Sequence, residues 1–156
     1  MELLKKKWVK ITLTVAACIC AVYLMVYVDV ILRARSAYLE GEKYWAWNEN
    51  PKLKADALEK EFQKDKLSLD KKLEKLKITQ DEYNKQYEIM KFRRDERISE
   101  SSIKYAYIWY QTTVELFSPP ESKWVKQARE KMPKAKDLWK KELKDKKIPF
   151  EDYMLE

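Results

Sequence analysis

The chain has 156 residues, of which 46% are hydrophobic and 38% charged, with a single glycine and no histidine. Lack of histidine removes the commonest general base and metal ligand, together with Ser–His and Cys–His catalytic arrangements. One glycine and five prolines leave little of the turn chemistry that β-hairpins and phosphate-binding loops need. The composition therefore predicts an all-α protein that is not an enzyme and carries no cofactor or metal.

Residues 11–32 form an apolar run that contains one charge, Asp29. At ~1.5 Å per helical residue the run covers about 33 Å, enough to cross a hydrocarbon core of ~30 Å. The rest of the chain is too polar to bury such a helix, so we predict a transmembrane helix. Asp29 precedes Arg33 by four residues, which predicts an ion pair at the end of the span. The residues expected to flank the membrane are Lys7, Trp8, Lys10, Asp29, Arg33 and Arg35.

The charges on the two sides of this run predict its orientation. Four lysines precede it (Lys5, Lys6, Lys7 and Lys10) and two arginines follow it (Arg33 and Arg35). This asymmetry favours a cytoplasmic N-terminus at residues 1–10 and a C-terminal part outside the cytoplasm, as in the periplasm behind a bacterial inner membrane.

A cleaved signal peptide or a lipoprotein acylated at Cys18 is the alternative, because residues 15–18 are similar to a lipobox. The apolar run is longer than a usual signal-peptide core and continues for ten positions after Cys18. We therefore expect an uncleaved signal-anchor.

Most of the net charge of +7 lies around the predicted span. Residues 1–35 hold six Lys/Arg and two Asp/Glu. Residues 36–156 hold the other 27 Lys/Arg and 24 Asp/Glu. The remainder is highly charged but nearly balanced, and its carboxylates alternate with lysines and arginines at helical spacing, as on a solvated face. We expect membrane lipid and other membrane or periplasmic proteins as partners, with self-association as an alternative, and no nucleic acid.

The soluble part begins with helices. The first helix is predicted to continue past the membrane to residue 48, with Gly41 as a candidate kink, and Asn50-Pro51 ends it. A second helix is expected over residues 52–77. Its apolar residues form a narrow seam in which some positions recur every seven residues. Such a seam must pack against another helix. The seam residues are Leu58, Phe62, Leu69, Leu73 and Leu76.

A third helix is predicted to start at a capping box formed by Thr79 and Glu82. Because the connection is short, the second and third helices should form an antiparallel hairpin. The third helix either continues to residue 117 or breaks near Ser99–Ser102. Pro119-Pro120 stops it, and these boundaries separate a stalk and hairpin at residues 33–118 from C-terminal helices and a tail at 119–156.

The C-terminal part is expected to contain a helix at 122–131 and a second helix, started or kinked by Pro133, that reaches residue 144. Residues 148–155 are expected to be an extended tail with four large apolar side chains. The tail either folds back on its own domain or docks on a neighbouring protein.

The segment from residue 103 to 144 resembles a tetratricopeptide repeat. Ala106, Tyr110 and Thr113 match the small, aromatic and small positions of that repeat's second helix, with the closing proline one residue late. Trp124 and Ala128 then match the opening helix of a following repeat. The segment is similar to the divergent repeats of envelope-assembly proteins. The resemblance implies a helical fold that acts by protein–protein binding.

Tyr and Trp are the residue types that dominate binding hot spots, and this chain has more of them than a small helical core readily covers. Core packing is the alternative explanation for the same residues. The candidate partner-binding residues are Tyr44, Trp45, Trp47, Tyr105, Trp109, Tyr110, Trp124, Phe150 and Tyr153.

Together these features predict a single-pass membrane protein that acts as a scaffold, or as an accessory or assembly subunit of an envelope membrane-protein complex. Two alternatives are a homo-oligomeric coiled-coil spacer built on the 58–76 seam, and a non-catalytic part of a small transporter or enzyme complex.

Overall fold

A computed structural model describes residues 7–155. Lys5 and Lys6 of the basic N-terminus lie outside the described residues. The described chain is all-α: five α-helices and a C-terminal 3₁₀ helix, with no strand between residues 7 and 155. The helices are α1 (Lys7–Glu49), α2 (Pro51–Glu74), α3 (Gln80–Ser99), α4 (Ser102–Leu116) and α5 (Lys123–Asp145), followed by η2 (Asp152–Leu155).

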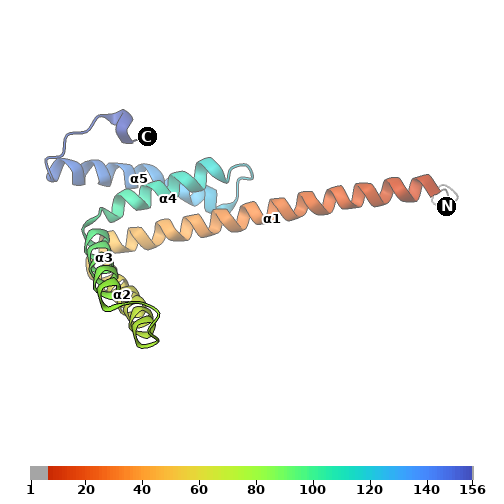
Figure 1. The fold of residues 1–156 in the computed structure, drawn as a ribbon. Helices are drawn as coiled ribbons and strands as arrows, with labels where there is room; N and C mark the ends of the chain where they lie inside the picture. Colours follow the sequence, from red (N-terminus) through yellow and green to blue (C-terminus); the bar gives the residue numbers. More distant parts are fainter. Residues whose placement is uncertain (1–6, 156) are drawn as a thin grey trace.

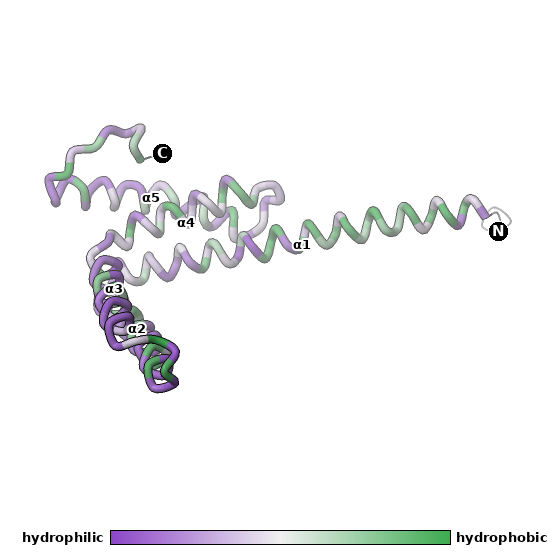
Figure 2. The backbone as a smooth tube through the Cα atoms, in the orientation of Figure 1, coloured by the Kyte–Doolittle hydropathy of each residue, from purple (hydrophilic) through white to green (hydrophobic). Residues whose placement is uncertain are grey.

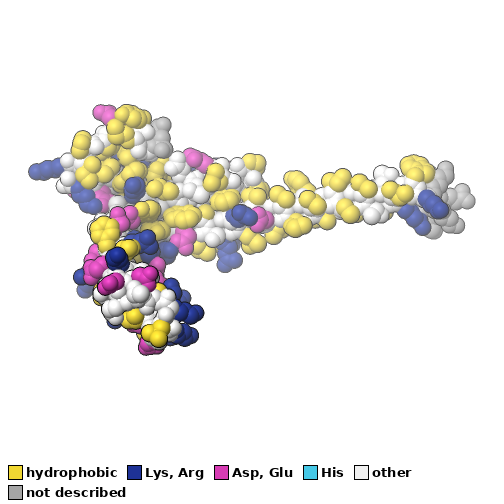
Figure 3. Space-filling view, in the orientation of Figure 1, with side chains coloured by type: hydrophobic (Ala, Val, Ile, Leu, Met, Phe, Trp, Pro, Cys, Tyr) yellow, Lys and Arg dark blue, Asp and Glu magenta, His cyan; other side chains and the backbone are white. Residues whose placement is uncertain are grey.

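Helix α1 is one continuous rod that carries the predicted span in its N-terminal part and the core of the soluble domain in its C-terminal part (Figure 1). It is long and apolar enough to cross a membrane, and none of the residues in its most apolar stretch is buried by the rest of the described chain. Hydrophobic residues predominate along this stretch, as Figure 2 shows on the backbone and Figure 3 on the molecular surface. Arg33 Nε donates to Asp29 Oδ2 over 2.7 Å, which confirms the predicted ion pair.

Helices α4 and α5 pack against the C-terminal third of α1 to make a three-helix bundle (Figure 1). The small residues Ala34 and Ala37 of α1, Ala106 of α4 and Ala128 of α5 are all buried. Small side chains at these contacts let the helix axes approach closely, and large aromatic rings fill the remaining space. Leu155 of η2 is buried against the same core, so the tail folds back on its own domain.

Helices α2 and α3 form an antiparallel hairpin, which we call the arm (residues 51–99). The arm leaves the bundle at an angle and contacts it at its base, mainly through α1 (Figure 1). Leu58, Phe62 and Leu69 of the predicted seam are buried. The expectation that the helix continues to residue 77 is wrong, because α2 ends at Glu74 and Leu76 takes a left-handed backbone angle of 52° in the turn. Leu76 is therefore 90% exposed rather than part of the seam.

The break predicted as an alternative near Ser99–Ser102 is present, since α3 ends at Ser99 and Ser101 caps α4. The prediction of two separate helices around Pro133 is wrong, because α5 runs through it. A proline inside a helix costs ~3 kcal/mol. Here Ala128 before it and Ala135 and Trp139 after it lie on one buried stripe, and their burial holds both halves in one helix.

The capping box that starts α3 is confirmed. Thr79 N donates to Glu82 Oε2 over 2.8 Å, and Glu82 N donates to Thr79 Oγ1 over 3.3 Å. The backbone and hydroxyl hydrogen bonds from Thr79 hold the pKa of Glu82 below its usual value.

Thr79→Ala is expected to lower the stability of the arm by about 1 kcal/mol, because the α3 N-terminus loses a backbone hydrogen-bond partner. Amide hydrogen exchange should accelerate in the first turn of α3 and remain unchanged in α4. Gln80→Ala, one residue later on an exposed site, is the control. Equal exchange in both variants would contradict the role given to the cap.

Candidate functional site: a half-buried carboxylate, an aromatic rim and an outlying arm

A carboxylate on α1 lies where the three bundle helices meet. Glu42 accepts a 2.6 Å hydrogen bond from Tyr110 Oη of α4. It also accepts hydrogen bonds of 2.7 and 2.6 Å from Lys131 Nζ of α5. The Lys131 ammonium in turn lies 5.9 Å from the ring centre of Tyr38 and 5.6 Å from that of Trp45. One half-buried salt bridge between α1 and α5 therefore lies beside aromatic rings and is tied to α4 by Tyr110.

The electrostatics of this cluster follow from its burial and its hydrogen bonds. Burial alone would raise the pKa of Glu42, but hydrogen bonds from Lys131, Tyr110 and Tyr38 hold it below its usual value. Burial, and then the hydrogen bond to Glu42, raise the pKa of Tyr38 to about 12 and that of Tyr110 further. At neutral pH the cluster consists of a carboxylate, an ammonium and two neutral phenols. It holds three helices together and contains no activated nucleophile or base.

The nine aromatic residues proposed from the sequence divide into core and surface. Tyr110 has no exposed surface and Trp45 packs against the core, whereas Tyr153 is 71% exposed. Tyr38, which the sequence reasoning did not select, is buried 5.5 Å from the Trp124 ring centre. The others are half-buried: Tyr44, Trp47, Tyr105, Trp109, Trp124 and Phe150.

Three of the half-buried rings form an aromatic rim, defined as Tyr44, Trp47 and Tyr105, at the end of the bundle where the arm begins. Tyr44 stacks on Tyr105 with 5.2 Å between ring centres and meets Trp47 edge-on at 5.1 Å. The Lys43 ammonium lies 5.1 Å from the Tyr44 ring centre and 5.2 Å from that of Trp47. The structure thus brings three of the sequence-selected residues together on one partly exposed surface.

Lys54 joins the arm to the bundle beside this rim. Its side chain is buried, with 6% of the residue exposed, and Lys54 Nζ donates 2.6 Å to the backbone carbonyl of Glu100. Burial lowers the pKa of Lys54, and the carboxylates of Glu100 and Glu142 partly offset this effect. Lys54 shares the buried face of α2 with Leu58 and Phe62, which lie four and eight residues later. This helical spacing is the sequence signal that could have identified Lys54 as a buried residue.

Lys54→Met is expected to free the base of the arm, because the apolar stem is kept and the hydrogen bond to the linker at residue 100 is lost. Spin labels at Lys75 on the arm and Lys126 on α5 should show a broader distance distribution by electron paramagnetic resonance. Lys60→Met, on the exposed face of α2, should leave the distribution unchanged. An unchanged distribution in Lys54→Met would show that other contacts set the arm's direction.

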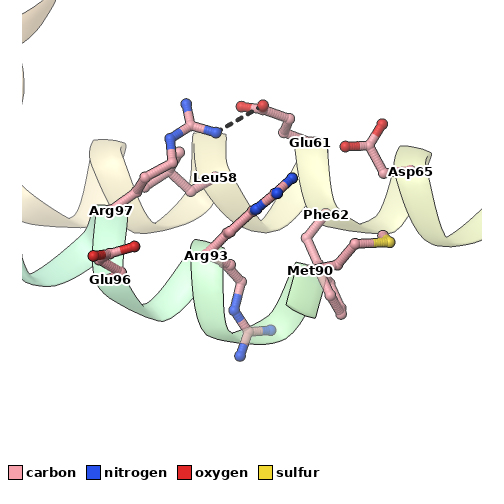
Figure 4. Close-up of a pocket in the computed structure, with 9 residues that line it drawn as sticks. Leu58, Glu61, Phe62, Asp65, Met90, Arg93, Glu96 and Arg97 are labelled. Atoms are coloured by element: carbon pink, nitrogen blue, oxygen red, sulfur yellow. Dashed lines mark hydrogen bonds and ion pairs between the residues drawn. The ribbon is translucent and has the colours of Figure 1, made fainter. Parts of the chain in front are cut away.

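A groove of about 300 Å³ runs along the arm between α2 and α3 (Figure 4). Leu58, Phe62 and Met90 supply its apolar surface. Arg97 donates to Glu61 over 2.7 Å, while Arg93 extends from α3 across the groove toward α2 (Figure 4). Outside the groove, Ile89 and Phe92 lie on the outer face of α3 and are 50% and 67% exposed. The arm therefore combines uncovered apolar side chains with arginine.

Arg94 holds the arm's two helices together. Arg94 Nη1 donates to Glu59 over 3.0 Å, and its guanidinium carbon lies 4.6 Å from the Phe62 ring centre. Arg94 was not among the residues selected from the sequence. The sequence signal for interhelical pairing was a group of arginines within four residues on one helix, beside a predicted antiparallel helix rich in acidic residues.

No protein-family model, no curated protein sequence and no solved structure matches this chain. The class of protein is therefore defined by the fold alone. It is an all-α protein with one candidate membrane-spanning helix that continues into a three-helix bundle with a projecting arm. The resemblance to tetratricopeptide repeats stays a prediction.

Proposed function

We propose that this chain is a membrane-anchored scaffold, or an accessory subunit that assembles an envelope membrane-protein complex through protein–protein binding. The main support for the proposal is the position and the exposed surface of the arm. The arm projects from the bundle, its groove and its outer apolar residues are uncovered, and α1 joins the same bundle to a membrane-spanning segment without a flexible linker. A rigid connection of this kind presents the arm at a set height and direction relative to the membrane.

The chemistry of the arm suits a protein partner. Exposed Phe92 and Ile89 supply apolar contact area, and Arg93 supplies a guanidinium that no residue among 7–155 pairs in a salt bridge. Aromatic residues and arginine are enriched at the centres of protein interfaces. We place the partner in or beside the inner membrane, on the extracytoplasmic side that the lysine excess before the span favours. The aromatic rim lies at the base of the arm and supplies further partly exposed tyrosine and tryptophan rings.

The coiled-coil spacer is less favoured. Leu58, Phe62 and Leu69 of its seam are buried within the chain, where α3 packs on α2, and are not free to pair with a second copy. Self-association through the outer face of the arm remains an alternative outcome of the following experiment.

A photo-crosslinking residue at Phe92 in the full-length chain, in cells that produce it naturally, tests the proposal. We expect a discrete adduct whose second component is a membrane or periplasmic protein. The matched control is the same crosslinker at Lys60, on the exposed face of α2, which should give no adduct of that mass. A chain that gives no adduct at Phe92 and is monomeric after mild detergent extraction would overturn the scaffold proposal. An adduct of two copies would replace it with self-association.

A further inference from the structure

The turn between α4 and α5 reaches beyond the soluble bundle and lies against the apolar part of α1. Pro119 and Pro120 line a shallow apolar hollow together with four residues of α1: Tyr23, Val26, Tyr27 and Val30. Figure 1 shows this turn beside α1, toward the N-terminal side of the bundle. All four α1 residues belong to the run predicted to cross the membrane.

The position of the hollow along α1 sets its depth. Its α1 residues lie three to ten positions before Arg33, the first cation after the apolar run. At ~1.5 Å per residue this is about 5–15 Å toward the membrane centre. The turn is fixed at this depth, because α4 and α5 are packed on the same helix that spans the membrane. If α1 crosses the bilayer, the turn is level with the outer part of its hydrocarbon region.

The turn has the composition that such a location requires. Residues 116–120 read Leu-Phe-Ser-Pro-Pro without a charge, and Leu116 is 70% exposed. Prolines have no backbone N–H, so two of these residues bring no donor that lipid would leave unsatisfied. The carbonyl oxygen of Pro120 accepts a 2.8 Å hydrogen bond from Ser122 N, which reduces the cost of burial further.

The residues at the base of the turn suit a headgroup layer. Trp124 is half-buried, with the Arg35 guanidinium carbon 5.8 Å and Lys123 Nζ 4.4 Å from its ring centre. Tryptophan and tyrosine concentrate at membrane interfaces, and cations beside them attract lipid phosphates. Two carboxylates near this edge are neutralised by arginines: Asp29 is paired with Arg33 over 2.7 Å, and Glu121 with Arg129 over 2.6 Å. Glu115, which directly precedes Leu116 on α4, accepts a hydrogen bond from Gln111 Nε2.

We propose that residues 116–120 form a second membrane contact, in which the α4–α5 turn inserts into the headgroup and outer acyl layer beside α1. The bundle then sits directly on the bilayer, held by the span and by this turn. This limits the tilt of the bundle relative to the bilayer and hence the angle between the arm and the membrane plane. The inference rests on α1 crossing the membrane but not on the identity of any protein partner.

Fluorophore labelling of the full-length chain in phosphatidylcholine–phosphatidylglycerol vesicles tests the proposal. Cys18 and Cys20 are replaced by alanine, and an environment-sensitive fluorophore is attached to a single new cysteine. Leu116→Cys is the test site, because an exposed position tolerates the change. Ala17→Cys reports on the N-terminal half of the span, about 7 Å from its midpoint at ~1.5 Å per residue. Lys126→Cys reports on a solvent-facing site one helical turn past the base of the turn. Lipids with a nitroxide near the headgroup or near the middle of the acyl chain serve as quenchers, with iodide as the aqueous quencher.

We expect the label at 116 to lose fluorescence mainly to the shallow nitroxide and to be shielded from iodide. The label at 17 should be quenched by the deep nitroxide, and the label at 126 by iodide alone. Iodide quenching at 116 equal to that at 126, with deep quenching at 17 retained, would overturn the inserted turn and leave the span intact. A label at 116 that neither the lipid nitroxides nor iodide quench would mean that protein covers the turn, and this result would equally overturn the proposal. Loss of deep quenching at 17 would overturn the span and the turn together, without bearing on binding by the arm.

Discussion

Replacement of Gly41 with alanine is expected to destabilise the bundle by about 1–3 kcal/mol, the usual cost of overpacking a core. A Cβ at this position would lie 2.6 Å from Cε1 and 2.8 Å from Cδ1 of Tyr110. In an exposed helix the same change would stabilise the protein by about 1 kcal/mol through backbone entropy. The clash reverses that sign, because the Tyr110 ring cannot move away easily. It is fully buried, and its hydroxyl is tied to Glu42.

Thermal unfolding of the full chain in detergent, followed by near-ultraviolet circular dichroism, measures this effect. Ser36→Ala, at an exposed site of α1, is the control and should have little effect. In a Tyr110→Ala background the penalty of Gly41→Ala should disappear, because the atoms that clash are absent. A penalty that persists there would assign the effect to α1 itself rather than to the contact between α1 and α4.

Glu42→Leu is expected to cost about 1–3 kcal/mol, because it leaves the buried hydroxyl of Tyr110 without its acceptor and Lys131 without its counter-charge. The control is Glu40→Leu on the same helix. Glu40 pairs with Lys43 at the surface, where removing an ion pair costs about 0–1 kcal/mol. Urea unfolding of both variants measures the difference. Equal losses would show that the Glu42 cluster is worth no more than a surface ion pair.

The same cluster predicts how stability depends on pH. Because the pKa of Glu42 is lowered in the folded state, its contribution is complete above its usual value of 4.5 and is lost as the pH falls through the lowered pKa. The pKa of Tyr38 is raised from 10.0 to about 12, so its contribution is complete below pH 10 and is lost as the pH rises toward 12.

Glu42→Gln removes the titrating group on the acid side, and the acid loss of stability should become shallower in this variant. Unfolding midpoints measured between neutral pH and pH 3 check this expectation. If the unfolding midpoint of Glu42→Gln fell with pH as steeply as that of the unmodified chain, a carboxylate other than Glu42 would be responsible for the loss of stability in acid.

Local features of the sequence were enough to predict most helices. The apolar run at 11–32, the Asn50-Pro51 end, the Thr79–Glu82 capping box and the Pro119-Pro120 stop each act within a few residues, so their effects are readable without the fold. Features that depend on distant residues were predicted less well. Pro133 was expected to separate or kink two helices, and only the burial of Ala135 and Trp139 against the bundle keeps α5 continuous.

The candidate sites show the same division. Tyr and Trp were identified from composition, but composition cannot separate a core ring such as Tyr110 from a rim ring such as Tyr44, because packing decides which is covered. The pair of Glu42 and Lys131 joins residues 89 positions apart, and no local pattern indicates such a contact.

The sequence by itself determined that this protein is helical, that one helix is apolar enough to cross a membrane, and that a hairpin follows it. Periodicity, capping and hydropathy are local properties, and they suffice for those conclusions. Only the tertiary structure decided that Gly41 makes room for a tyrosine ring rather than a kink, that the arm stands apart from the bundle, and that the α4–α5 turn lies beside the apolar part of α1. These outcomes depend on which surfaces the helices bury against one another, and that choice is made by the whole chain.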